Sequence, residues 1–215
     1  MGGTLRKFFE AGARIRLVMF SDGAEGYGTP GDKGLIIQRR QLETETVCRI
    51  LGIEQYYNLH GLDWSLSVNN ATYRQVIHHI RSFKPDVVFT HAPTDYNDHQ
   101  SVSKVTTEGW FHAALPCAME TEKVWHLVPL YEFEVIKSML QPTHVVDITD
   151  TFDAKMKAME SYNSQKGIVG SIFQLMKGRA MERGYLIGVK YGEAFIRSNY
   201  QPRGIKCVET LLEKS

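Results

Sequence analysis

The stretch Pro85-Asp86-Val87-Val88-Phe89-Thr90-His91-Ala92-Pro93-Thr94-Asp95-Tyr96-Asn97-Asp98-His99-Gln100 joins a strand signal to a cluster of polar side chains. Its apolar, β-branched first half is typical of a buried strand. The polar second half then falls where open α/β sheets keep their sites, at the carboxyl end of a strand. Carboxylates and imidazoles are also zinc ligands. The stretch predicts a candidate metal site, with a bland alternative in which Asp95 and Asp98 cap the next helix and His91 packs.

Apolar strand-like runs alternate with helix-like segments on both sides of this stretch. Strands are predicted at 15–20, 55–59, 86–90, 128–133 and 144–148, and helices at 4–10, 38–51, 71–83, 100–114 and 150–162. From 166 to 190 the pattern weakens, and no element is predicted there. Strands that alternate with helices of about 10 to 15 residues indicate βαβ units and a largely parallel sheet. The prediction is one α/β domain over residues 1–215, with its polar turns gathered at one edge of the sheet.

Bulk composition excludes several classes of function. The formal net charge of the 215 residues is +1, so bulk electrostatics indicate neither a nucleic-acid partner nor an anionic membrane. Three scattered cysteines predict neither a disulfide framework nor a zinc ribbon, and they favour a reduced, cytoplasmic protein. No apolar run approaches the roughly 20 residues of a spanning helix. A homo-oligomer is compatible with such a sequence.

The segment Gly26-Tyr27-Gly28-Thr29-Pro30-Gly31 has the spacing of a dinucleotide-binding loop and follows a predicted strand. That function needs the last glycine within the opening turn of a helix. Pro30, Gly31 and Gly34 delay any helix, so residues 24–34 are predicted to form a flexible loop. Together with residues 166–190, this loop is expected to line the site entrance and to set specificity.

Asp98 and His99 stand at the junction between the polar loop and the next helix. There His99 can project into the site while Asp98 caps the helix or orients a ligand. A catalytic zinc needs about three protein ligands, so this junction supplies only part of a metal site.

Several segments of the chain together resemble one known family. The family's GGTL helix and T/S-D-G turn are similar to Gly2-Gly3-Thr4-Leu5 and Ser21-Asp22-Gly23, and its R-x-x-E helix ending in LGI is similar to Arg40-Gln41-Leu42-Glu43 and Ile50-Leu51-Gly52-Ile53. Its P-D-v-v…T-H-x-P-x-D…D-H block is similar to Pro85 to His99. Its later motifs are similar to Asp147-Ile148-Thr149, Ser164-Gln165 and Glu193-Ala194-Phe195. These segments cover nearly the whole chain. It resembles the PIG-L/LmbE-like family of zinc-dependent N-acetylglucosaminyl deacetylases.

The resemblance implies a Rossmann-like, three-layer fold and a zinc ion, or another divalent metal, that activates water to hydrolyse an N-acetyl group on an N-acetylglucosamine-type sugar. It makes His99 a metal ligand and Asp98 the residue paired with it in the motif. Tyr96 falls where members place a residue that stabilises the oxyanion, although a phenol is a weaker acid than an imidazolium. Arg40 and Asp63 match positions that touch the sugar.

One family motif is absent from residues 1–215. Members carry A-H-P-D-D-E at the end of a first strand, before the GGTL helix, where it supplies two zinc ligands and the general base. We expect a truncated record of a longer protein, because loss of a buried parallel strand would expose apolar surface. The alternative is a natural, non-catalytic sugar-binding or scaffold relative; the codons upstream of Met1 separate the two. On either account we expect residues 1–215 neither to hold zinc tightly nor to deacetylate.

Overall fold

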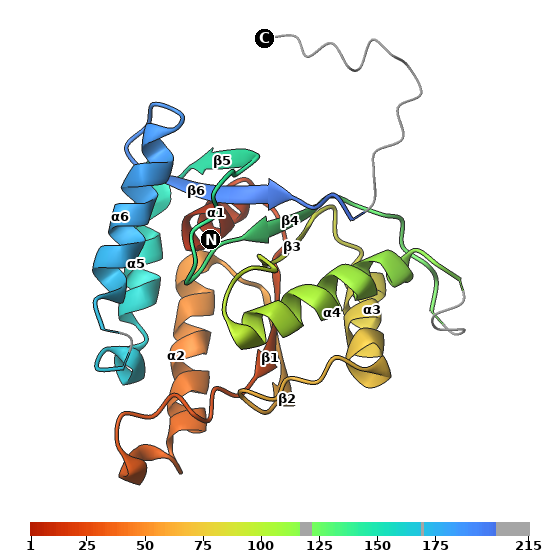
Figure 1. Cartoon of the computed structure of the whole chain (residues 1–215), viewed down its shortest axis with the longest axis horizontal. Coiled ribbons are helices and arrows are strands. Elements are labelled where there is room, and N and C mark those ends of the chain that lie inside the picture. Colours follow the sequence, from red (N-terminus) through yellow and green to blue (C-terminus); the bar gives the residue numbers. More distant parts are fainter. Residues whose placement is uncertain (117–121, 169, 201–215) are drawn as a thin grey trace.

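A computed structural model describes residues 1–116, 122–168 and 170–200 (Figure 1). Its helices are α1 (Gly2–Glu10), α2 (Ile36–Leu51), α3 (Asn70–Phe83), α4 (Asn97–Ala113), α5 (Phe152–Glu160) and α6 (Ile172–Tyr185), and its strands are β1 (Arg16–Ser21), β2 (Gln55–Gly61), β3 (Val88–His91), β4 (Leu130–Phe133), β5 (His144–Asp147) and β6 (Gly192–Arg197). Cys48 is a buried free thiol, whereas Cys117 and Cys207 lie outside the described residues. The alternation of helices and strands confirms the predicted α/β class.

The strands form two sheets. β1 pairs with β2 in parallel, and the second sheet has the order β3-β4-β6-β5. β3 and β4 are parallel, whereas β6 runs antiparallel to both of its neighbours. Among the described residues, β1 pairs only with β2 and β3 only with β4, so one edge of each strand carries no partner.

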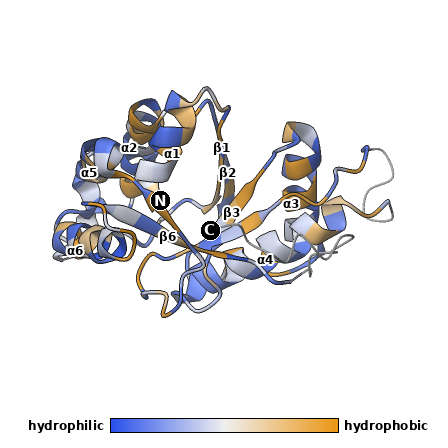
Figure 2. Ribbon diagram, turned by 90° about the horizontal axis from the view of Figure 1, so that it is seen from above, coloured by the Kyte–Doolittle hydropathy of each residue, from blue (hydrophilic) through white to orange (hydrophobic). Residues whose placement is uncertain are grey.

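Helices cover the strands on both sides, which gives three layers (Figure 2). On one side α1, α2 and α5 enclose a cluster built from Ile15, Val47, Cys48, Leu51, Ile53 and Ala158. On the other side α3 and α4 pack together over Val76, Ile77, Ile80, Val105, Trp110, Ala113, Val128 and Leu130. These apolar clusters fix the strands, and with them the loops at the carboxyl ends of β3 and β4.

Local chemistry sets the ends of two helices that flank these strands. α2 stops at Gly52, whose φ of 76° is the left-handed conformation that glycine adopts at low cost. α3 begins with a capping box, in which the Asn69 side chain accepts from the Thr72 amide and the Thr72 hydroxyl accepts from the Asn69 amide. It ends at Lys84, immediately before Pro85. These ends agree with the sequence prediction.

Two elements of the structure were not predicted. α6 occupies a stretch in which no element was expected, because its buried residues are Ala180, Arg183 and Gly184 rather than large apolar side chains. β6 has four consecutive buried residues that include Glu193, so it lacks the alternation of a half-buried strand.

Two glycines in helices offer a matched test of the packing between α3 and α4. A Cβ added at Gly109 in α4 would lie 2.6 Å from Val76 Cγ1, whereas one added at Gly178 in α6 would meet nothing within 4 Å. We expect Gly109→Ala to destabilise the fold by about 1–3 kcal/mol through overpacking. Gly178→Ala should instead stabilise it by up to about 1 kcal/mol through helix propensity. Urea unfolding of both variants tests this, and equal midpoints would contradict it.

Candidate active site

His99 is held by a buried carboxylate one helical turn before it. The His99 Nδ1 atom lies 3.0 Å from Asp95 Oδ1, and Asp95 is 0% exposed. Because a carboxylate accepts hydrogen bonds, this contact places a proton on Nδ1, and in the neutral ring Nε2 then carries the lone pair. A metal-binding histidine is usually oriented in this way by a second carboxylate or carbonyl.

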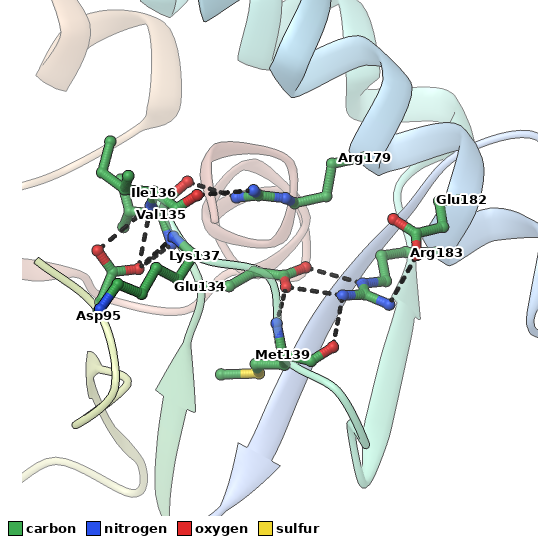
Figure 3. A network of polar contacts seen from close by, with 9 residues as sticks. All are labelled: Asp95, Glu134, Val135, Ile136, Lys137, Met139, Arg179, Glu182 and Arg183. Atoms are coloured by element: carbon green, nitrogen blue, oxygen red, sulfur yellow. Dashed lines mark hydrogen bonds and ion pairs between the residues drawn. The ribbon is translucent and has the colours of Figure 1, made fainter.

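Asp95 is itself fixed by backbone amides (Figure 3). It accepts hydrogen bonds from the amides of Tyr96 (2.7 Å), Val135 (2.9 Å), Ile136 (3.0 Å) and Lys137 (3.3 Å). Burial opposes ionisation of this carboxyl group. The hydrogen bonds from His99 and from the amides of Tyr96 and Val135 outweigh burial and lower the pKa of Asp95 to about 2. Asp95 is therefore an anion that holds His99 in one orientation.

His91, at the end of β3, stacks on His99. The two rings are 4.0 Å apart between centroids and 4° from parallel. Burial, and then the neighbouring His99, lower the pKa of His91 to about 3, so the ring is neutral at pH 7. The in-plane lone pairs of parallel rings do not converge on one ion, so His91 has the geometry of a packing partner rather than of a second ligand.

Tyr96 and Asp98 both precede His99, Tyr96 at the N-cap of α4 and Asp98 in its first turn. The Tyr96 ring is 43% exposed and stands edge-on to His99, with centroids 5.6 Å apart. The Asp98 Oδ2 atom accepts a hydrogen bond from the Trp64 amide at 2.8 Å. Asp98 thus ties the start of α4 to the loop after β2, and the pairing with His99 is made by Asp95.

Arg40 and Asp63 both hold the loop that follows β1. Arg40 Nη1 donates to the Gly23 carbonyl at 2.9 Å, and Asp63 Oδ2 accepts from the Glu25 amide at 2.8 Å. Gly23 has a φ of 68°, which favours glycine, and a Cβ there would lie 1.7 Å from Arg40 Nη1 and displace that side chain. The buried Arg40 Nε atom has no hydrogen-bond partner among the described residues.

A small cavity of about 30 Å³ adjoins Arg40 and is lined by Asp22, Asn58 and His60, among others. Asp22 Oδ1 lies 2.8 Å from both Asn58 Nδ2 and His60 Nδ1. The cavity therefore offers carboxylate, amide, imidazole and guanidinium groups side by side. Such groups recognise hydroxyl and amide groups of a polar ligand.

The described residues fit one position of a zinc site. His99 offers a free Nε2 atom backed by a carboxylate, which suits a zinc ligand. No group of three His, Cys, Asp or Glu side chains that could hold a metal occurs within 1–116, 122–168 and 170–200. A complete catalytic zinc site needs about three protein ligands. The described residues thus offer one histidine with the geometry of a ligand, together with its orienting carboxylate.

The role of Asp95 was missed in the sequence, although a signal was present. Asp95 and His99 are four residues apart where α4 begins, and residues at that spacing face each other on a helix. Adjacent helical residues such as Asp98 and His99 point in directions about 100° apart. The spacing favours Asp95 as the partner of His99.

The fold and this site define a class: an α/β domain that carries a carboxylate-oriented histidine at the carboxyl end of a parallel strand. Residues 1–110 match the PIG-L family, described as GlcNAc-PI de-N-acetylase. That match spans half of the chain, and the chain belongs to this family. Within the described part of the chain, no helix has both the length and the apolarity to cross a membrane.

Individual relatives agree with this assignment. Diacetylchitobiose deacetylase of Thermococcus kodakarensis is 24% identical over 77% of this chain, which spans 64% of that relative's length. The structure of N,N'-diacetylchitobiose deacetylase from Pyrococcus horikoshii superposes with a TM-score of 0.83 at 25% identity, over 96% of this chain and 82% of that one. A 4-carboxy-2-hydroxymuconate hydratase from Pseudomonas putida shares the fold, with a TM-score of 0.80 at 20% identity and coverage of 96% and 92%.

Proposed function

We propose that this protein is a metal-dependent hydrolase that removes the N-acetyl group from an N-acetylglucosamine-type sugar or glycoside. The observation that carries the proposal is the His99–Asp95 pair, in a chain of the de-N-acetylase family. A bound zinc ion would lower the pKa of a water molecule and polarise the acetamide carbonyl. We further propose that residues 1–215 act as a single domain and that the protein is cytoplasmic.

The roles of the site residues follow from their surroundings. His99 would ligate the metal through Nε2, and the exposed Tyr96 phenol beside it would donate a hydrogen bond to the developing oxyanion. Asp98 would lie next to the metal ligand in the catalytic site, and its carboxylate would keep the loop at Trp64 in place. Arg40 and Asp63, which hold the neighbouring glycine-rich loop, would contact sugar hydroxyls.

The experiment measures acetate release from diacetylchitobiose and N-acetylglucosamine by the product of the gene, with any in-frame codons upstream of Met1 retained and zinc added. We expect zinc-dependent acetate release, and we expect His99→Ala to lower it by at least about a hundredfold. Loss of an outer-shell partner costs about 10- to 100-fold in activity, and loss of the metal ligand itself should cost more. His112→Ala is the matched control, since His112 lies on the same helix and contacts the Glu108 carbonyl.

A non-catalytic sugar-binding relative predicts a different result. Such a protein would bind the sugars, release no acetate, and lose binding in Arg40→Ala rather than in His99→Ala. For residues 1–215 alone we expect weak zinc binding, because the described residues supply one ligand. Stoichiometric zinc that survives dialysis of this chain against a weak chelator would contradict that expectation.

A further inference from the structure

The segment after β4 connects Asp95 to helix α6. Residues Val135, Ile136 and Lys137, here called the 135–137 bend, direct their amides at Asp95. The carbonyls of Val135 and Ile136 point the other way and accept hydrogen bonds from Arg179 of α6 (Figure 3). The bend thus separates a buried carboxylate from a guanidinium.

Two peptide groups span this separation. The Val135 carbonyl and the Ile136 amide belong to one peptide group, and the Ile136 carbonyl and the Lys137 amide belong to the next. In each, Arg179 donates to the oxygen while the N–H donates to Asp95. A cation on a peptide oxygen polarises that group and strengthens its N–H as a donor, because chained hydrogen bonds reinforce one another. The charge of Arg179 therefore acts on Asp95 through two aligned peptide groups.

A second arginine of α6 fixes the flanks of the bend. Arg183 forms two hydrogen bonds with Glu134, at 2.9 and 2.8 Å, and donates to the Met139 carbonyl at 2.8 Å. Glu134 in turn accepts from the Met139 amide at 2.6 Å. Glu134 before the bend and Met139 after it are thus both hydrogen-bonded within the buried Arg183–Glu134 ion pair. This ties the bend to helix α6.

We propose that Arg179 is a positioning residue for His99: it holds and polarises the 135–137 bend, the bend fixes Asp95, and Asp95 keeps His99 in its Nδ1–H form with Nε2 free. A surface arginine that served only solubility would not bridge two successive carbonyls behind the one carboxylate that orients the site histidine. Arg179 donates to the two carbonyls of the bend, so its effect on His99 runs through the bend. The inference rests on the proposed function only in naming His99 a metal ligand.

The test uses Arg179→Met, which removes every donor, and Arg179→Lys, which keeps the charge but cannot bridge two carbonyls in the same fork. Lys177→Met, an exposed residue of the same helix, is the matched control. Nitrogen-15 NMR of the His99 ring at a fixed pH of about 8 reports the tautomer without any metal. We expect the Nδ1–H form to dominate in the parent and in Lys177→Met, and to give way to a mixture in Arg179→Met.

Metal binding supplies a second readout. With the product of the gene, we expect Arg179→Met to weaken zinc binding about tenfold, the low end of the effect of outer-shell partners. Arg179→Lys should fall between parent and Arg179→Met in both measurements, and it serves alone if Arg179→Met does not fold. An unchanged His99 tautomer in a folded variant would overturn the proposal. A tautomer shift in a protein that releases no acetate would support the positioning role of Arg179 and refute the proposed deacetylase function.

Discussion

Replacing Asp95 by alanine is expected to lower the free energy of unfolding by about 3–5 kcal/mol, the range for removal of one partner from a buried charged network. The variant would leave the amides of Tyr96 and the 135–137 bend, together with the His99 ring, without their acceptor in a fully buried place. Asp95→Asn keeps one carbonyl oxygen and should lose less, about 1–3 kcal/mol. Urea unfolding at pH 7 measures both losses.

The same carboxylate predicts how stability depends on pH. The pKa of Asp95 falls from 3.8 to about 2, so its contribution is complete above pH 3.8 and is lost as the pH drops toward 2. A shift of this size corresponds to about 2 kcal/mol. Asp95→Asn should therefore flatten the acid limb of the stability curve, whereas Asp86→Asn, at an exposed carboxylate, should not. Parallel acid limbs for the parent and Asp95→Asn would contradict this role.

The helices and strands up to α5 could be predicted because their buried faces are apolar at regular spacing. Val76, Ile77 and Ile80 of α3 are an example, and all three are buried. α6 could not be found in this way, because it faces the protein with Ala180, Arg183 and Gly184. Arg183 is buried there only because Glu134, 49 residues earlier, neutralises it. A partner so distant in sequence leaves no periodic signal.

The site shows the same division between local and distant information. The residue types at the carboxyl end of a strand predict a candidate metal site, and the family resemblance makes His99 its ligand. The spacing of His99 from Asp95 lies within one helical turn. Apart from the Tyr96 amide, the amides that fix Asp95 come from residues about 40 positions later, and their side chains carry no mark of the role. Backbone donors are invisible to a pattern of side chains. The muconate hydratase, which shares the fold and is named for a different reaction, agrees with the general rule that a fold alone does not fix the reaction.

The second large effect is expected at Glu193, which lies in β6 but caps α1. Its carboxylate accepts from the Gly3 amide at 3.2 Å and the Thr4 amide at 2.8 Å, and lies 2.7 Å from Lys155 Nζ. Glu193 is 5% exposed and the Lys155 side chain 10%. Burial opposes its ionisation, but the amino group of Met1 and Lys155 outweigh burial, and the pKa of Glu193 lies well below its ordinary value.

Glu193→Gln keeps an acceptor for the α1 amides but leaves the Lys155 ammonium buried without a counter-ion. We expect it to lower the free energy of unfolding by about 3 kcal/mol, because an unpaired buried charge is costly. Adding Lys155→Met removes that charge, so the double variant should be less destabilised than the sum of the single variants, with a coupling of at least about 1 kcal/mol.

The pKa of Glu193 is lowered on folding, so its contribution is present above pH 4.5 and is lost as the pH falls below that value. Urea unfolding at pH 7 and at pH 4 measures the cycle; additive losses at pH 7 would show that the pair does not anchor α1 by charge.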